Sequence, residues 1–153
     1  MVPVATGASG FVTARSSLGA DLSLIASVLA VALLTAGVVL ARRRRYQAHR
    51  WTQSGGVALN AVPVVVWMVV SLVRYILPGI PGTLSQHGHL LAAMHATVGA
   101  FGVALGLFLL VRGNQLMARD ASLRRYRTPM RVAYLLYVGG VALGVALYVV
   151  TYG

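Results

Sequence analysis

Four long stretches of this chain are apolar and contain no charged residue, and they constrain the fold more than any other feature. They comprise residues 22–40, 54–73, 90–111 and 132–152. Each is 19 to 22 residues long, so a helix rising about 1.5 Å per residue can cross a hydrocarbon core of about 30 Å. In lipid the backbone amides and carbonyls must be satisfied internally, which favours helices even in valine-rich runs. We therefore predict an all-α integral membrane protein, a four-helix bundle of two antiparallel hairpins, with helices at residues 22–41, 54–77, 89–111 and 131–152.

The arginines are distributed unevenly around these runs. All thirteen basic residues are arginine, and eleven of them lie between the first and second runs or between the third and fourth. Only Arg15 and Arg74 lie on the opposite side. Cytoplasmic loops of membrane proteins are enriched in Lys and Arg. Both arginine-rich loops are therefore predicted to face the cytoplasm of a bacterial inner membrane, with both termini of this multi-pass chain outside.

The net charge of +11 raises the question of a nucleic-acid partner. The charge lies in the loops between the apolar runs, and no segment is left for a folded basic domain. Nucleic acid is therefore not expected, and part of the charge is expected to lie against anionic lipid headgroups. The expected partners are the lipid bilayer and a larger membrane protein complex, with a homo-oligomer as an alternative.

Several residue types that catalysis uses are absent or misplaced. The chain has no cysteine and no lysine, which excludes disulfides, thiolate nucleophiles, iron–sulfur clusters and Schiff-base chemistry. Its two acidic residues, Asp21 and Asp120, lie at the edges of the runs, so no span offers a carboxylate for proton or cation coupling. We predict no catalytic residue and a protein that is not an enzyme. Residues 1–20 are predicted to be a short, mobile outer tail, and residues 21–153 a single transmembrane domain.

The sequence GVALG occurs twice, at residues 102–106 and 140–144. Each copy places two glycines four residues apart on one helix face, an arrangement that lets helix backbones approach closely. The two copies lie at matched depth on antiparallel predicted helices, so they could face each other. Glycine is also common in membrane helices in general, but the matched depth favours a packing role for Gly102, Gly106, Gly140 and Gly144.

Three of the four histidines lie within residues 85–95, at the outer start of the third run. His95 is the one ionisable side chain well inside a predicted span, about 8 Å from its outer boundary. Polar groups at such depth face the bundle interior and find partners there. Met68, Ser71 and Tyr148 are predicted at a similar depth. A hydrogen bond from His95 to Ser71 or Tyr148 is the structural alternative to a functional role.

Two cofactors are compatible with the residues near His95. A haem held by one histidine and one methionine would use His95 and Met68. Copper would suit imidazole and thioether ligands, and the candidates are His87, His89, Met94 and His95. Without a carboxylate or cysteine, transient copper handling is favoured over permanent binding. The alternative interpretation of His87 and His89 is that they are solvated interface residues.

Four short motifs resemble a bacterial family of small four-helix membrane proteins. They are AHRWTQ at the start of the second helix, MHATVG early in the third, RRYRTPMR before the fourth and GVALYVVTY at its end. The family is of unknown function, and some members are linked to the assembly of haem-copper cytochrome oxidases through copper delivery. The resemblance covers about residues 40–152 and implies that His49 and His95 correspond to family histidines. The family also has histidines late in helix two and in the second inner loop, where this chain has RYILPG and SLRRY.

Three functions follow as hypotheses. The first is an accessory or assembly protein of a respiratory haem-copper oxidase that handles copper on the outer side. The second is a structural transmembrane subunit that packs within a larger respiratory or photosynthetic complex. The third is a small haem- or quinone-binding electron carrier, for which His95, Trp67 and Arg74 are the candidate residues. The resemblance favours the first.

Overall fold

The computed structural model describes residues 10–76, 78, 87–117 and 126–153, and nearly all of them are helical. No β-strand occurs in this described part, so the predicted all-α class is confirmed there. The main helices are α1 Leu18–Arg42, α2 Tyr46–Pro63, α4 His87–Met117 and α5 Arg127–Tyr152. Between α2 and α4, the short helix α3, Val69–Ser71, is flanked by two π-helical segments, η1 Val64–Met68 and η2 Leu72–Ile76.

Three of the described helices are long and apolar enough to cross a membrane. Their bounds are Leu18–Arg42, Leu90–Leu116 and Arg127–Tyr152. The predicted second span, residues 54–77, corresponds instead to the shorter helix α2 and the helical segments that follow it. At the arginine-rich turns, each of the four main helices extends beyond its apolar run. Helix α2, for example, begins eight residues before its run. Hydropathy locates the part of a helix that suits lipid, whereas the helix itself continues into polar sequence.

Pro63 explains why the second helical segment changes its geometry. Proline has no N–H to donate, and its ring clashes with the carbonyl of the preceding turn. The π-helical segment η1 begins directly after Pro63, and the amide of Val69 donates to the carbonyl of Val64, five residues earlier. This wider turn re-satisfies the backbone after the proline. The chain is therefore helical from residue 46 to residue 76, which includes the described part of the second predicted span. This segment is not one regular α-helix.

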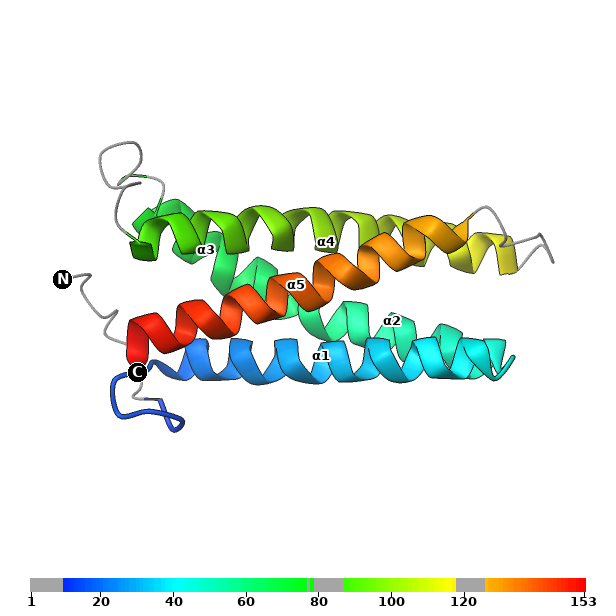
Figure 1. Cartoon of the computed structure of the whole chain (residues 1–153), viewed down its shortest axis with the longest axis horizontal. Coiled ribbons are helices and arrows are strands. Elements are labelled where there is room, and N and C mark those ends of the chain that lie inside the picture. Colours follow the sequence, from blue (N-terminus) through cyan, green and yellow to red (C-terminus); the bar gives the residue numbers. More distant parts are fainter. Residues whose placement is uncertain (1–9, 77, 79–86, 118–125) are drawn as a thin grey trace.

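The helices form two antiparallel hairpins that cross each other (Figure 1). Helices α1 and α2 make one hairpin, and α4 and α5 make the other. The segment that follows α2 leaves α1 and reaches α4 through η2, while α5 leaves α4 and packs on α1. The start of α1 and the end of α5 lie at one end of the molecule, and the turn between α1 and α2 lies at the other.

The segment before α1 differs from the predicted mobile tail. Residues 10–17 fold back into a hydrogen-bonded turn, in which Gly10 N donates to Ser16 O (2.8 Å) and Ser16 N donates to Thr13 O (3.1 Å). The hydroxyl of Ser17 caps α1 by accepting from Ala20 N at 3.3 Å, a role in which serine stabilises a helix start. The predicted tail thus includes a structured part, and residues 1–9 lie outside the described residues.

The interior is small and the outer surface is apolar. A core cluster joins Leu34 of α1, Val57 of α2 and Tyr137 of α5, with partly buried neighbours from α1, α4 and α5. Many large apolar side chains are exposed, among them Phe101 and Phe108 of α4. Soluble monomers rarely expose apolar surface on this scale. The helices are therefore compatible with association with a lipid bilayer.

The turn between α1 and α2 contains an arginine in the left-handed backbone conformation. Arg44 has φ 59°, Arg44 N donates to Ala41 O (3.0 Å), and Arg45 N donates to Leu40 O (2.9 Å). These bonds form a Schellman motif, in which glycine usually occupies the left-handed position. The left-handed conformation costs an L-residue roughly 1–2 kcal/mol.

We expect Arg44→Gly to raise the free energy of unfolding, by up to about 1 kcal/mol after the greater flexibility of unfolded glycine is subtracted. Unfolding in detergent micelles measures this difference. Arg43→Gly is the matched control. Arg43 has φ −82°, so glycine there relieves no left-handed backbone strain. A larger loss of stability in the Arg44 variant than in the Arg43 variant would contradict the interpretation.

Candidate functional site

His95 lies between the two helices of the second hairpin. Its Nδ1 lies 2.9 Å from the carbonyl oxygen of Gly140 on α5. A carbonyl only accepts hydrogen bonds, so Nδ1 carries a proton, and in the neutral imidazole Nε2 is then the nitrogen with the lone pair. The ring rests on Gly144, where an added Cβ would lie 2.9 Å from its Cε1 atom. The interior-facing position predicted for His95 is therefore formed by two glycines of the neighbouring helix.

Tyr148, one of the two partners predicted for His95, makes its hydrogen bond to another residue. Tyr148 donates its hydroxyl to Asp21 instead, at 2.5 Å. The side chain of Ser71 lies outside the described part. The acceptor that His95 does use is a main-chain carbonyl, which sequence patterns do not identify.

The two residues proposed for haem lie on different helical elements. Met68 belongs to η1, which packs on α1, whereas η2 packs on α4, the helix of His95. The side chain of Trp67, a candidate for the electron-carrier hypothesis, lies outside the described part.

Of the four residues proposed for copper, the structure describes the side chains of Met94 and His95. Helix α4 begins at His87, so the backbone positions of His87 and Met94 are two turns apart along one face, about 10 Å along the helix axis. Met94 is 48% exposed, whereas the ring of the adjacent His95 contacts α5. The side chains of His87 and His89 lie outside the described part. Among the described residues, no group of three or more His, Cys, Asp or Glu is placed to hold a metal ion.

The four predicted packing glycines all lie where α4 meets α5. An added Cβ at Gly106 would lie 2.7 Å from the Tyr137 hydroxyl, and one at Gly102 would lie 3.4 Å from Cβ of Leu136. Gly140 faces Gly99, whose Cα lies 3.8 Å from the added Cβ. The two GVALG copies are thus offset along the interface, and each faces other residues of the opposite helix. Gly106 and Gly144 accommodate a tyrosine and a histidine ring, respectively.

Residues 49–53 form a second group of polar contacts at the opposite end of the molecule. His49 Nδ1 lies 2.7 Å from Gly37 O, and Gln53 Nε2 donates to Leu34 O at 3.1 Å. Both acceptors are on α1. The neighbouring Arg50 turns to α4, where its Nε donates to Asn114 Oδ1 at 2.6 Å. The sequence indicated only an interfacial helix start here, because the choice of partner helix depends on how the hairpins pack.

Asp21 is the largest fully buried side chain of the described part and was not predicted to have a role. It has no exposed surface. Its Oδ2 accepts from Phe11 N (2.6 Å) and Val12 N (2.8 Å), and its Oδ1 accepts from the Tyr148 hydroxyl. The sequence did contain a signal for Asp21. A single acidic residue in the first turn of an apolar helix needs hydrogen-bond donors when it is withdrawn from water. Asp21 joins the turn of residues 10–17, α1 and α5.

A fourth polar contact lies in the middle of the bundle. Ser27 of α1 donates its hydroxyl to Asn60 Oδ1 of α2 at 3.3 Å, and both residues are buried. The buried hydroxyl of Tyr137 makes no hydrogen bond in the described structure. The interhelical partner that a membrane-buried asparagine requires is therefore a serine of the same hairpin.

These polar groups join pairs of helices and do not converge on one pocket. His95 and His49 make the same kind of contact, in which the imidazole Nδ1 lies next to a glycine carbonyl of the neighbouring helix. The chemistry left to His95 is that of one imidazole nitrogen, Nε2, which can accept a proton or bind one metal ion. In comparisons with known proteins, no family model matches this chain, and no match was found among curated proteins or solved structures.

Proposed function

We propose that this chain is a non-enzymatic membrane protein that serves as a structural or accessory subunit of a larger membrane complex. One observation carries the proposal: the two described imidazole rings contact main-chain carbonyls of neighbouring helices, His95 at Gly140 and His49 at Gly37. Such contacts stabilise helix pairs in a bilayer, where an unpaired polar group is costly. They do not assemble a reaction centre.

The charge distribution supports an orientation for this subunit. The described arginines of the α1–α2 turn and of the ends of α4 and α5 lie at one end of the bundle. We place that end in the cytoplasm of a bacterial inner membrane and the Asp21 end outside, following the enrichment of arginine in cytoplasmic loops. The exposed apolar helix faces are then available to lipid and to a partner protein. A respiratory oxidase is the partner that the motif resemblance implies.

A second candidate function is a contribution to copper or haem handling through His95. The Nδ1 contact with Gly140 O supports it, because histidine ligands usually donate their other ring N–H to a carbonyl or carboxylate. That contact fixes the tautomer in which Nε2 can bind a metal. His95 would supply one ligand, and further ligands would come from a partner subunit, a second copy, or His87 and His89.

Purification from membranes in a mild detergent tests both candidates. We expect the tagged chain to elute with a larger complex, without a Soret band and without stoichiometric copper. Elution as a lone monomer would contradict the subunit proposal. Stoichiometric copper or haem that is lost in a folded His95→Ala variant would establish the second candidate in its place.

A further inference from the structure

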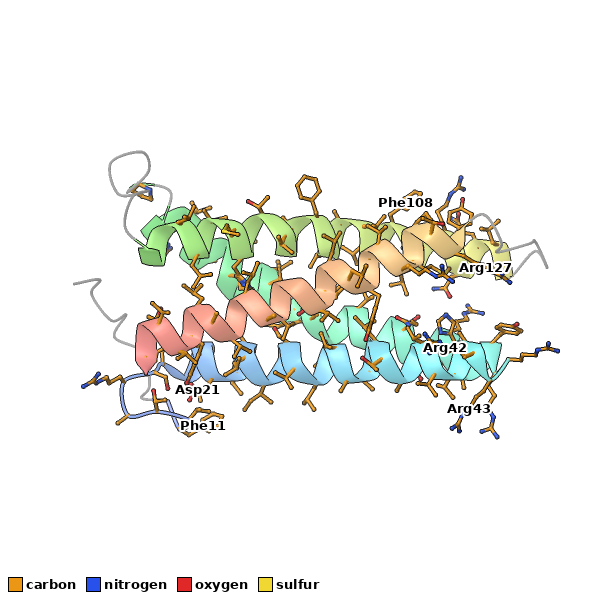
Figure 2. All side chains as sticks on the ribbon, in the orientation of Figure 1. Phe11, Asp21, Arg42, Arg43, Phe108 and Arg127 are labelled. Atoms are coloured by element: carbon orange, nitrogen blue, oxygen red, sulfur yellow. The ribbon has the colours of Figure 1, made fainter. Side chains whose placement is uncertain are left out.

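One end of the bundle carries many arginines, and we call it the arginine end. Figure 2 shows Arg42, Arg43 and Arg127 there, remote from Asp21 and Phe11 at the other end. The described members, from the α1–α2 turn, the start of α2, the end of α4 and the start of α5, are Arg42, Arg43, Arg44, Arg45, Arg50, Arg112, Arg127 and Arg131.

The chain cannot neutralise these charges by itself. It contains only two acidic residues. Asp21 is buried at the opposite end, where its oxygens accept bonds from Phe11, Val12 and Tyr148. That leaves Asp120, which lies outside the described residues, and one carboxylate can neutralise only one of eight arginines. The arginine end therefore requires anions from outside the chain.

Arg50 is held in a defined place within this end. Its Nε donates to Asn114 Oδ1 at 2.6 Å, across the junction of the two hairpins. Its guanidinium carbon lies 5.7 Å from the centre of the Trp51 ring. Within the described residues, Nε is the guanidinium nitrogen of Arg50 that makes a hydrogen bond. The two terminal NH₂ groups can then bind an oxyanion, for which the planar guanidinium is well shaped.

Two aromatic residues indicate the depth of this site. Trp51 is 66% exposed and Tyr46 is 54% exposed. Tryptophan and tyrosine are enriched at the level of lipid headgroups. Arg50, adjacent to Trp51, thus lies at the depth of the headgroup phosphates. A free inorganic anion would make no contact with these apolar rings.

We propose that the arginine end binds the phosphate groups of anionic glycerophospholipids in the adjacent leaflet, with Arg50, oriented by Asn114, at the centre of the site. The surrounding arginines attract the anionic headgroups, and Arg50 binds one phosphate at the junction of the hairpins. This inference depends on insertion in a membrane and not on a partner complex. Its failure is therefore distinguishable from failure of the proposed function.

Native mass spectrometry of the full chain in neutral detergent, with added phosphatidylglycerol or phosphatidylcholine, tests the proposal. Wild type should retain phosphatidylglycerol in preference, and Arg50→Gln should weaken that binding about fivefold. Asn114→Ala keeps every charge but removes the partner that orients Arg50. It should therefore also weaken phosphatidylglycerol binding, by a smaller factor than Arg50→Gln. Arg15→Gln, at the opposite end, is the matched control and should bind like wild type. Unfolding temperatures of all variants show whether they remain folded.

Three outcomes would overturn the proposal. Equal retention of the two lipids by wild type would remove the anionic site. Displacement of phosphatidylglycerol by millimolar inorganic phosphate would show a site for free phosphate instead of lipid. Wild-type binding by folded Arg50→Gln and Asn114→Ala variants would show a diffuse charge effect without a centre at Arg50.

Discussion

Replacing Gly144 or Gly106 with alanine is expected to lower the free energy of unfolding by about 1–3 kcal/mol, the usual cost of an added group in a packed interior. At Gly144 the new Cβ would lie 2.9 Å from Cε1 of His95 and 3.3 Å from its Nδ1. The ring would have to move and would lose its contact with Gly140 O. At Gly106 the new Cβ would lie 2.8 Å from Cε2 of the buried Tyr137. Unfolding titrations in mixed micelles measure both effects.

Two neighbouring glycines provide matched controls for this prediction. At Gly140 the nearest atom to an added Cβ lies 3.8 Å away, and at Gly139 it lies 4.0 Å away. Alanine there fits without a clash and should be neutral or stabilising by about 0.5–1 kcal/mol, since it favours the helix. Equal losses at all four positions would contradict the ring-contact explanation.

The double variant His95→Ala/Gly144→Ala isolates the contact between the ring and Gly144. If the clash is the cause, adding Gly144→Ala to His95→Ala should cost little, because the ring is already absent. Additive losses would instead show that Gly144 matters for another reason.

Asp21→Ala is expected to lower the unfolding temperature more than any other substitution discussed here. It removes the acceptor of three hydrogen bonds at once and leaves Phe11 N, Val12 N and the Tyr148 hydroxyl without their partner. Because an unpaired buried donor bears its full desolvation cost, the turn of residues 10–17 should detach from α1 and α5. Trypsin cleavage after Arg15, in that turn, reports this detachment directly.

Tyr148→Phe is the control for Asp21→Ala. It removes one donor and leaves the two backbone contacts of the carboxylate in place. Both the loss of unfolding temperature and the increase in cleavage should be smaller than for Asp21→Ala. If trypsin cleaved the Asp21→Ala chain no faster than the wild-type chain, the carboxylate would not be what holds the turn.

The sequence predicted the helical class and three spans because these depend on local composition. Apolar runs without charge located α1, α4 and α5. The helix ends were harder to predict, because the turns of helix at Tyr46–Gln53 and after Val111 contain many polar residues and are still helical. Proline at position 63 disrupts the regular α-helix, but the π-helical form of the next turn depends on packing.

The candidate site was predicted in part, for a related reason. The position of His95 inside a span indicated that it faces other helices. Its acceptor could not be predicted, because the register of α4 against α5 brings the Gly140 carbonyl to the ring. The contact of Asp21 with Tyr148 joins residues 127 positions apart. The Arg50–Asn114 bond likewise depends on how one hairpin packs on the other.

The central claim, a chain embedded in the membrane with its arginine end in the cytoplasm, is tested most directly by labelling single cysteines. The chain has no cysteine of its own, so Ala14→Cys and Gln47→Cys each create one site and leave every arginine in place. Both positions are exposed, Ala14 before α1 and Gln47 at the start of α2. In intact spheroplasts, a maleimide that cannot cross membranes should label Ala14→Cys and should label Gln47→Cys only after lysis. Labelling of Gln47→Cys in intact spheroplasts would contradict the claim.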